Sequence, residues 1–479
     1  MGIGRRMLAG AAAAILLPGL AGAQGTPTQR PDQLAFRALY KELVEINTTL
    51  SAGDCTAAAR AMAARLSAAG FPDQDLHLIV EPDHPREGNL VAVLPGTDPT
   101  AKAVLLLAHI DVVEANRADW ERDPFTLVEE NGYFYARGAS DDKAQAAIWV
   151  DTLIRMKAEG FRPRRSVKMA LTCGEESDGA LNGAELLVTR HRDLIDAGFA
   201  LNEGAGGLMG DDGKPVSLSI QSGEKVYQDF TLAVTNPGGH SSRPVKDNAI
   251  VHLAGALDRI GAYDFPVMLN ETTRAYFTAM APLVDPESGA AMRALVADPT
   301  DAAAAAVLSR DPTWNSMLRT TCVATQVSAG HAPNALPQRA EANVNCRIFP
   351  GVPVEAVQAR LAELAADPKV TVTPDATTRL TPAPPPLSPA IMKPLKAAAQ
   401  RMWPGVPIVP FQSTGATDGK YLNSYGIPTY GLTGIFSTRA SNGAHGLNER
   451  IGVKSLYDAR DFLYGLVKAY AQAKQESRP

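Results

Sequence analysis

Short apolar strands alternate with helices along the first 200 residues, and this alternation limits most strongly how the chain can fold. Three segments have the composition of buried strands: NLVAVL at 89–94, AVLLLA at 103–108 and SVKMALT at 166–172. A helical pattern at 143–159 separates the last two, and a further strand is expected at 197–202. Such alternation predicts an α/β fold with a mixed, largely parallel sheet.

The pattern changes near residue 223. A strand at 225–235 and a helix at 247–262 come first, and an Ala-rich helical stretch follows at 286–310. Two β-like runs at 320–330 and 340–348, a helix at 353–366 and a short strand at 370–373 complete the segment. The order βα and then ββαβ predicts a small α+β, ferredoxin-like sheet with helices on one face.

After the proline-rich TPAPPPLSP at 381–389, the α/β pattern resumes and ends in a helix at 453–474. The sequence therefore predicts a domain at 223–380 that is inserted as a lid into a larger domain. Residues 24–222 and 381–479 form that larger domain, and the proline stretch is one of the two hinges.

Composition excludes one class of partner. The chain has 479 residues, of which 45% are hydrophobic and 20% charged, which suits two globular domains. Its net charge is −5, and no Lys/Arg-rich stripe is interleaved with aromatic residues. Nucleic-acid binding is therefore not expected.

Residues 1–23 have the features of a secretory signal peptide. Arg5 and Arg6 precede an apolar run, and Ala21, Gly22 and Ala23 provide a small-residue cleavage site. A membrane anchor is the alternative, but the run is short and Pro18 interrupts it. We expect cleavage near Ala23 and a soluble, periplasmic or secreted protein with no membrane contact.

Four cysteines in an exported chain raise the question of disulfides. Cys322 and Cys346 fall nearly opposite each other in the two β-like runs, which is compatible with a cross-strand bridge or with two reduced core cysteines. Cys55 and Cys173 are expected to be unpaired, with Cys173 in the core.

Acidic residues recur where the predicted strands end. His109 and Asp111 follow the second strand, Asp141 and Asp142 open the next helix, and the later strands lead into Glu175, Glu176 and Glu203. Open α/β sheets place their ligand crevice at these strand ends. Each residue alone is typical of a solvated loop, but together the carboxylates require cations, and histidines beside them favour zinc. His445 offers a second imidazole.

The motifs that contain these residues resemble the motif set of a known enzyme family. AHIDVV, WERDPF, NGYFYARGASDDK, GEES, NEG, GGHSSRP, PNALP and AHGLNER occur in order over roughly residues 85–455. The set resembles the motifs of the co-catalytic zinc peptidase and aminoacylase family, which includes carboxypeptidase G, aminoacylase, carnosinase-type dipeptidases and succinyl-diaminopimelate desuccinylase.

The resemblance implies two zinc ions bridged by Asp141 and a water molecule. His109 and Glu203 would bind one ion, and Glu176 and His445 the other. Asp111 would orient His109, and Glu175 would be the general base. The family also implies a cis peptide bond between Asp141 and Asp142.

Further residues would contact the substrate. His240 in GGHSSRP would stabilise the oxyanion as a third catalytic residue, together with Glu175 and Asp111. Asn334 and Arg347 would grip the substrate, and Arg347 suits a free carboxylate because guanidinium pairs with one bidentately. Gly415 and Thr417, in STGATDGKY, would contact the substrate backbone.

The sequence thus predicts an exported di-zinc metallopeptidase that cleaves an amide bond next to a free carboxylate in dipeptides or short peptides. One alternative is an N-acyl-amino-acid amidohydrolase of aminoacylase type. Another is a non-catalytic module that binds small carboxylates, although Glu175 beside five ligand positions argues against it. A homodimer through the lid is a further expectation, which the Ala-rich stretch at 286–310 weakens.

Overall fold

The computed structural model describes residues 30–177, 180–375, 380, 382–438 and 442–474. The predicted signal peptide, residues 1–23, lies outside these residues. Within the described part, no helix combines the length and apolar character needed to cross a bilayer.

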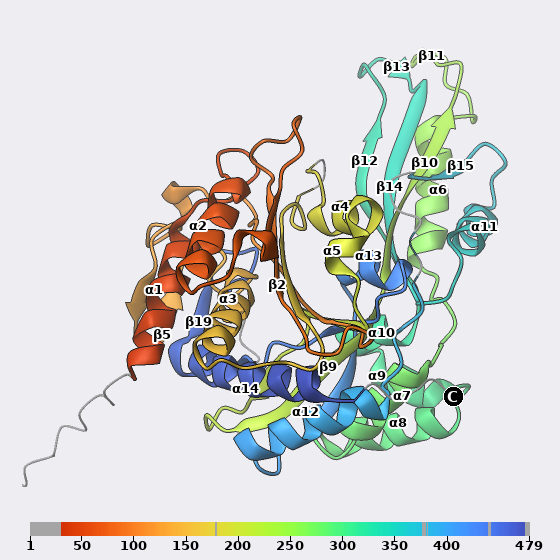
Figure 1. Ribbon diagram of the computed structural model, residues 1–479. Helices are drawn as coiled ribbons and strands as arrows, with labels where there is room; N and C mark the ends of the chain where they lie inside the picture. The colour runs from red at the N-terminus through yellow and green to blue at the C-terminus, as the bar shows by residue number, and fades with distance from the viewer. Residues whose placement is uncertain (1–29, 178–179, 376–379, 381, 439–441, 475–479) are drawn as a thin grey trace, which may run out of the picture.

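A ten-stranded sheet forms the larger body of the molecule (Figure 1). Nine strands follow one another across it in the order β1 (Leu76–Ile79), β2 (Asn89–Leu94), β6 (Val167–Thr172), β3 (Val104–His109), β7 (Phe199–Asn202), β17 (Thr429–Gly431), β9 (Pro215–Glu224), β8 (Gly207–Met209) and β18 (Phe436–Ser437). The tenth, β16 (Ile408–Ser413), pairs with β9. Neighbours from β6 to β17 are parallel, whereas β1, β2, β8 and β9 introduce antiparallel pairs. The predicted mixed α/β sheet is confirmed.

Helices cover both faces of this sheet. β3 is buried along its whole length, which explains its continuous apolar run. One face packs against α1 (Pro31–Glu45), α2 (Cys55–Ala68), α3 (Lys143–Ala158), α12 (Pro389–Met402) and α14 (Val453–Gln472). The other packs against α4 (Gly183–Arg190), α5 (Arg192–Ile195) and α13 (Gly419–Ser424). Two short 3-10 helices, η1 (Asp73–Asp75) and η2 (Arg117–Asp119), and a small sheet of β4 (Val128–Glu130), β5 (Tyr133–Tyr135) and β19 (Arg450–Gly452) complete the body.

A second sheet projects from the body and forms the lid. It consists of β10 (Val226–Thr235), β12 (Thr321–Ala329), β14 (Arg339–Ile348) and β15 (Thr371–Pro374), which are antiparallel in the order β12, β14, β10, β15. Helices α6 (Ala249–Gly261) and α11 (Val354–Ala365) cover one face, and β11 (Gly239–His240) pairs with β13 (Ala335–Leu336) at the free end (Figure 1). The chain order and strand order match the predicted ferredoxin-like arrangement.

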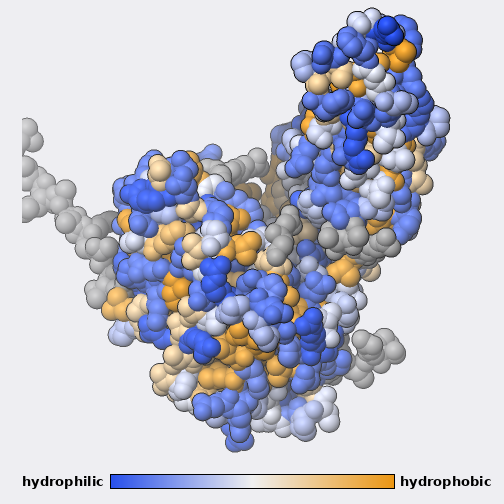
Figure 2. All heavy atoms as spheres, turned by 90° about the horizontal axis from the view of Figure 1, so that it is seen from above, coloured by the Kyte–Doolittle hydropathy of each residue, from blue (hydrophilic) through white to orange (hydrophobic). Residues whose placement is uncertain are grey.

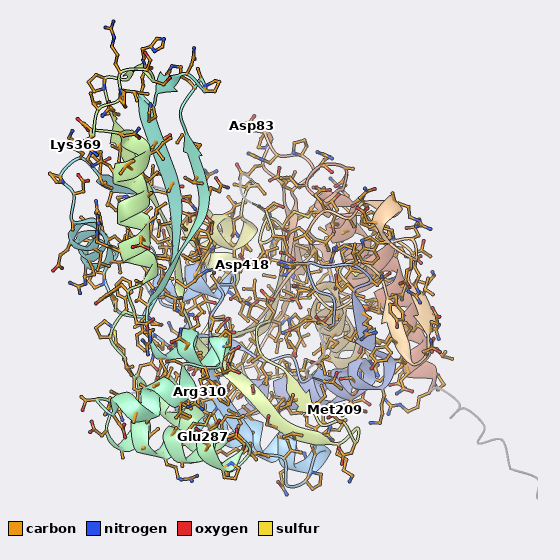
Figure 3. The ribbon with its side chains drawn as sticks, turned by 180° about the vertical axis from the view of Figure 1, so that it is seen from behind. Asp83, Met209, Glu287, Arg310, Lys369 and Asp418 are labelled. Atoms are coloured by element: carbon orange, nitrogen blue, oxygen red, sulfur yellow. A yellow bond between two sulfur atoms is a disulfide. The ribbon has the colours of Figure 1, made fainter. Side chains whose placement is uncertain are left out.

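Side chains alternate along the lid strands. In β14 the even-numbered residues are buried under the helices, and the odd-numbered ones lie on the open face. That open face is turned toward the larger body (Figures 1 and 3). Seen from above, the lid and the body form two lobes with a hollow between them (Figure 2).

The Ala-rich segment packs differently from the rest of the inserted sequence. It corresponds to α8 (Pro286–Ala297) and α9 (Ala302–Leu308), and it is flanked by α7 (Glu271–Met280) and α10 (Pro312–Leu318). These four helices form one apolar core with Val409 and Phe411 of β16, a strand of the large sheet. The segment therefore lies against the larger body, a placement that no local pattern in the sequence indicated.

All four cysteines form disulfides. Cys322 and Cys346 face each other across β12 and β14, with Cα atoms 4.1 Å apart, so the cross-strand bridge is confirmed. The prediction that Cys55 and Cys173 are unpaired was wrong, because they are bonded with Cα atoms 6.1 Å apart. Helix α2 begins at Cys55 and packs beside β2, which pairs with β6, and Cys173 directly follows β6. A separation of 118 residues concealed this pairing in the sequence.

Candidate active site

The predicted metal ligands gather at one edge of the large sheet. His109 is the last residue of β3, Glu176 lies just beyond β6, and Glu203 directly follows β7. Because these three strands are parallel neighbours, their carboxyl ends meet at the same edge. Asp141 approaches from the turn before α3, and His445 from the loop before β19.

Asp141 lies between the two histidines. Its Oδ1 is 3.1 Å from Nε2 of His109, and its Oδ2 is 3.2 Å from Nε2 of His445. Glu203 is on the His109 side, with Oε1 4.0 Å from Nε2, and Glu176 is on the His445 side, with Oε2 2.9 Å from Nε2. This division into two halves around one shared carboxylate is the arrangement that the resemblance implied.

The orientation of His109 is fixed by its other ring nitrogen. Nδ1 lies 3.1 Å from the backbone oxygen of Asp111 and 3.6 Å from its Oδ1. Donation from Nδ1 to Asp111 leaves Nε2, which faces Asp141, as the ring nitrogen that could bind a metal ion. Asp111 Oδ2 also accepts a hydrogen bond of 2.9 Å from the backbone N–H of Glu176, so Asp111 connects the two halves.

The donor set fits metal ions. His109, Asp141 and Glu176 place ligand atoms within 4.8 Å of one another, and so do His109, Glu175 and Glu203. Burial raises the pKa of Glu203 well above its usual range, which shows that its negative charge is poorly compensated by the protein alone. Bound cations would supply that compensation, and the imidazole and carboxylate ligands suit zinc.

The histidine at the open side of the cluster is protonated in the metal-free protein. Hydrogen bonds to Asp141 and Glu176 raise the pKa of His445 to about 10. Hydrogen bonds from His109 and from His445 hold the pKa of Asp141 well below its usual range, although burial opposes this. Metal ions would take the place of these protons, so binding should release them.

Glu175 has the environment of a general base. Burial is the main cause that raises its pKa, to about 8, and the nearby carboxylates of Asp418 and Glu176 add to this. A carboxylate with a raised pKa can accept a proton and release it again near neutral pH. The two adjacent glutamates differ in their neighbours, because Glu176 contacts His445 and Glu175 lies near His109 and Glu203.

Glu449 stabilises the turn that carries Asp141, and the sequence did not mark this residue as functional. Its buried carboxylate accepts hydrogen bonds from the backbone N–H groups of Gly138, Ser140 and Asp141. Its place in the AHGLNER motif was the only signal available. As the resemblance implied, the peptide bond between Asp141 and Asp142 is cis.

The loop after β16 approaches the cluster from the other side. Gly415 is half-buried, whereas Thr417 is buried and donates from both its N–H and its hydroxyl to Glu224. Asp418, which the sequence analysis also passed over, accepts hydrogen bonds from Thr172 and Asn182 beside the loop that carries Glu175. Substrate contact by Gly415 and Thr417 stays a prediction.

The remaining substrate residues belong to the lid. His240 and Asn334 are exposed near the β11 and β13 pair at its free end (Figure 1). In the described residues, none of their contacts reaches the carboxylate cluster. Nδ1 of His240 instead accepts from the N–H and hydroxyl of Ser242. The structure therefore does not place these two residues on the metal site.

Arg347 lies at the other end of the lid, where β14 pairs with the start of β10. Its guanidinium is 4.6 Å from the centre of the Tyr227 ring, and among the described residues it takes part in no ion pair. A half-buried guanidinium without a carboxylate partner is suited to bind one from a substrate.

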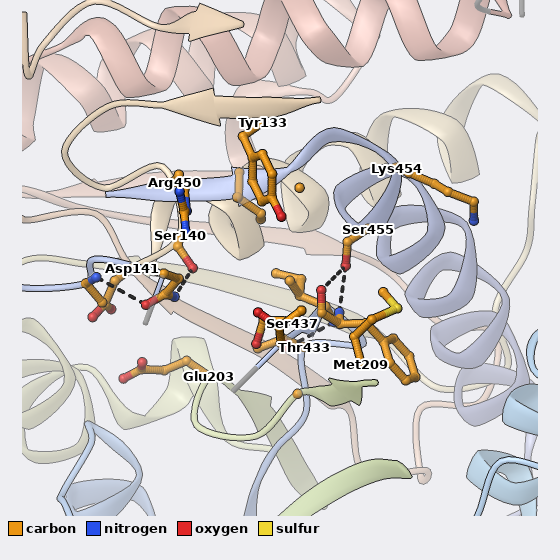
Figure 4. A pocket seen from close by; sticks show the side chains of 18 of the residues that line it. Tyr133, Ser140, Asp141, Glu203, Met209, Thr433, Ser437, Arg450, Lys454 and Ser455 are labelled. Atoms are coloured by element: carbon orange, nitrogen blue, oxygen red, sulfur yellow. Dashed lines mark hydrogen bonds between the residues drawn. The ribbon is translucent and has the colours of Figure 1, made fainter. Parts of the chain in front are cut away.

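A cavity of about 490 Å³ opens directly beside the cluster (Figure 4). Asp141 and Glu203 stand at one end of it, and Met209 and Lys454 at the other. Its apolar walls come from Tyr133, Met209, Ile435, Phe436 and Ile451. These residues lie far apart in the sequence, on β5, β8, β18, β19 and the loop before β18, so no local motif marked them.

Comparison with known proteins gives a consistent result. The model of peptidase family M20/M25/M40 matches residues 105–469. The human N-fatty-acyl-amino acid synthase/hydrolase is 28% identical over 92% of this chain and 88% of its own. Mouse aminoacylase-1 is 27% identical over 80% of this chain and 84% of its own.

Solved structures share the fold. A metallo-carboxypeptidase from Sulfolobus solfataricus aligns with a TM-score of 0.66 and 20% identity, over 92% of this chain and 100% of its own. Human carnosine dipeptidase 1 aligns with a TM-score of 0.63 and 18% identity, over 92% of this chain and 97% of its own. With the family match and the clustered ligands, these findings show that the chain is a hydrolytic enzyme of peptidase family M20/M25/M40, whose members are metal-dependent.

Proposed function

We propose that this enzyme uses two zinc ions to hydrolyse the amide bond of N-acyl amino acids that carry an apolar acyl group. The observation that carries the proposal is the cavity beside Asp141 and Glu203, whose walls are mostly apolar. An amide bond held at the cluster would direct its acyl chain into this cavity, where burial of apolar surface favours binding. The names of the human and mouse relatives, an N-fatty-acyl-amino acid synthase/hydrolase and an aminoacylase, support this substrate class.

The amino-acid part of the substrate would face the lid. Arg347 would pair with its free carboxylate, because no carboxylate among the described residues forms an ion pair with the guanidinium. Zinc ions, when bound by the predicted ligands, would supply Lewis acidity for the amide carbonyl and the attacking water. Glu175 would take the proton from that water and pass it to the leaving amine nitrogen.

His240 would act on the other side of the amide. Movement of the lid would bring its imidazole to the carbonyl oxygen, where it would stabilise the developing negative charge. Asn334, from the same end of the lid, would contact the substrate as well. Both roles depend on a change in lid position.

Dipeptides are the second candidate, since Arg347 would serve their carboxylate equally well and solved structures of similar fold include a carnosine dipeptidase. A dipeptide, however, brings an α-ammonium group into the cavity. The cavity walls beyond Asp141 and Glu203 are mostly apolar, and they suit an acyl chain better than a charged ammonium group (Figure 4). We therefore rank apolar N-acyl substrates first.

Export also belongs to the proposal. Both disulfides would persist in an oxidising compartment such as the periplasm or the exterior. The homodimer expected through the lid has one supporting feature, since β12 is an edge strand on which Val323 and Val327 are 60% and 68% exposed.

The test is hydrolysis of a substrate panel by the zinc-loaded protein. N-acyl amino acids of increasing acyl chain length would be compared with dipeptides that have the same C-terminal residue. We expect kcat/KM to rise with chain length and to exceed the values for dipeptides. A Met209→Trp variant, which narrows the far end of the cavity, should lower kcat/KM for the longest chains while leaving short ones nearly unchanged.

Glu175→Ala is the control that removes the proposed general base. It should abolish hydrolysis of the whole panel while two zinc ions remain bound. Faster cleavage of dipeptides than of every N-acyl substrate would overturn the preferred substrate class but not the mechanism. No hydrolysis by the zinc-loaded wild type would instead favour a binding protein.

A further inference from the structure

A second, much smaller cavity lies behind the metal cluster, where β7, β9 and the start of α13 meet. Its volume is about 10 Å³, which is close to the smallest space that holds one water molecule or an ion of similar size. Asn202, Gln221, Glu224, Thr417 and Gly419 are among the residues that line it. Figure 3 places the neighbouring Asp418 at the junction between the lid and the body.

Three oxygen atoms of these side chains have no hydrogen-bond partner. They are Oδ1 of Asn202, Oε1 of Gln221 and Oε1 of Glu224, and the residues are 1%, 5% and 6% exposed. Buried polar atoms in folded proteins are nearly always paired, because an unpaired one keeps the full cost of leaving water. Three unpaired acceptors around one cavity indicate that an occupant completes it.

The amide orientations are fixed by hydrogen bonds. Nε2 of Gln221 donates to Oε2 of Glu224 at 3.3 Å. Nδ2 of Asn202 donates to the hydroxyl oxygen of Thr417 at 3.3 Å, and that hydroxyl donates in turn to Oε2 of Glu224 at 2.9 Å. Rotating either amide by 180° would set two acceptors against each other. Burial raises the pKa of Glu224 to about 7. When its carboxylate is ionised, the three side chains have only acceptor oxygens left for the occupant.

This chemistry favours a cation over water. A water molecule has two hydrogens for three acceptors, and its own oxygen would find no free donor on these side chains. A cation interacts with all three oxygens and also balances the charge of Glu224. Glu224 is the only carboxylate among the three side chains with unpaired oxygens, and one carboxylate favours one positive charge, since divalent sites in proteins are usually built around several carboxylates.

We propose that this cavity binds one alkali cation, Na⁺ or K⁺, through Glu224 and the amide oxygens of Asn202 and Gln221. Glu203, a predicted metal ligand, also lines the cavity, whereas the three residues with unpaired oxygen atoms are not among the predicted ligands. Asn202 immediately precedes Glu203, and Glu224 immediately precedes Lys225, where the chain enters the lid. The cation would therefore join the strand that carries a catalytic ligand to the origin of the lid.

Thermal unfolding of the zinc-loaded enzyme tests the site. Choline chloride would be replaced stepwise by NaCl or KCl at constant total salt, so that only the identity of the cation changes. A ligand that binds the folded state raises the Tm with its concentration. We expect the Tm to rise with the logarithm of Na⁺ or K⁺ concentration, with the zinc content constant throughout.

Two variants change the site in different ways, one through its charge and the other through its shape. Glu224→Gln removes the charge and keeps the shape. Gly419→Ala keeps the charge but adds a methyl group whose Cβ would lie 3.6 Å from Oε1 of Glu224 and 3.0 Å from the hydroxyl oxygen of Thr417. Each should abolish the dependence of Tm on alkali cations. The matched control is Gly465→Ala on α14, where a Cβ meets nothing within 4 Å, and it should retain the dependence.

Crystals soaked in RbCl give an answer that does not depend on the variants. An anomalous peak within coordination distance of Glu224 would support the proposal. The proposal is overturned if the Tm is equal in Na⁺, K⁺ and choline, or if a water molecule fills the cavity in the presence of rubidium.

Discussion

Glu449 provides the clearest prediction at the scale of single residues. Its carboxylate receives hydrogen bonds from three backbone N–H groups and from the Arg137 guanidinium at 2.9 Å, and both side chains are almost fully buried. Glu449→Gln would leave the charge of Arg137 unpaired. We expect a loss of about 3–5 kcal/mol in the free energy of unfolding. We also expect zinc affinity to fall about 10- to 100-fold, because the turn that carries Asp141 loses its support.

Urea unfolding of the zinc-free protein and a zinc titration measure these two effects. Glu129→Gln is the matched control, because Glu129 pairs with Arg37 on the surface and should change stability by less than about 1 kcal/mol. Equal effects of the two variants would contradict the role given to Glu449.

Arg347 supports a second prediction at the same scale. If its guanidinium binds the substrate carboxylate, Arg347→Ala should raise KM for an N-acyl amino acid about 30-fold or more. The corresponding N-acyl amide, which lacks that carboxylate, should show little change. Arg339→Ala removes a 61% exposed arginine from the same face of β14 and is the control. Steady-state kinetics of Arg347→Ala on the two substrates test this prediction. An equal rise in KM for both substrates would indicate a structural role for Arg347.

At the scale of elements, a histidine joins two parts of the lid. His252 on α6 contacts Asp367, which lies after α11, and Asp247, which also pairs with Lys369. These hydrogen bonds raise the pKa of His252 above its usual value of 6.5. The stabilisation from the charged imidazole is therefore fully present below pH 6.5, and it is lost as the pH rises through the folded-state pKa.

We expect an NMR titration of His252 to give a midpoint above 6.5. Asp367→Asn should lower that midpoint, because it removes the partner with the largest effect. Amide exchange in the segment after α11 should become faster above the midpoint in the wild type only. A midpoint that Asp367→Asn leaves unchanged would show that this contact does not form in solution.

Local pattern was sufficient to predict most elements, and tertiary contact decided the remainder. The apolar runs of β2, β3 and β6 and the long helix α14 have nearly the predicted bounds. Strand β9 was missed, because SLSIQS alternates small polar and apolar residues that are also common in loops. The helical stretch predicted at 286–310 corresponds to α8 and α9, and only the structure shows that these helices, with α7 and α10, pack on β16.

Some residues of the candidate site could also be predicted from local pattern, and others only from tertiary contacts. Its metal ligands are adjacent to strand ends and belong to ordered motifs, so they were visible in the sequence. The cavity walls and the Cys55 to Cys173 bridge join distant segments, and no local pattern reports such contacts. The position of His240 depends on how the lid is oriented, which is a property of the whole chain.

At the scale of the whole molecule, the proposed mechanism requires movement between the lid and the body. His240 lies on the exposed end of the lid, and within the described residues its contacts are confined to that end. His240→Ala should therefore lower turnover about 10²- to 10³-fold, as loss of an oxyanion donor does, and should leave two zinc ions bound. Turnover and zinc content measured on the same samples test this. Undiminished turnover would remove the lid from the catalytic mechanism.

The two disulfides stabilise the body and the lid separately and do not link the body to the lid. Cys55 and Cys173 are both in the body, Cys322 and Cys346 are both in the lid, and these four are all the cysteines of the chain. Each cross-link therefore strengthens one half internally, and neither fastens the halves together. In an oxidising compartment, the two bonds would therefore stabilise each half without restraining the proposed movement between them.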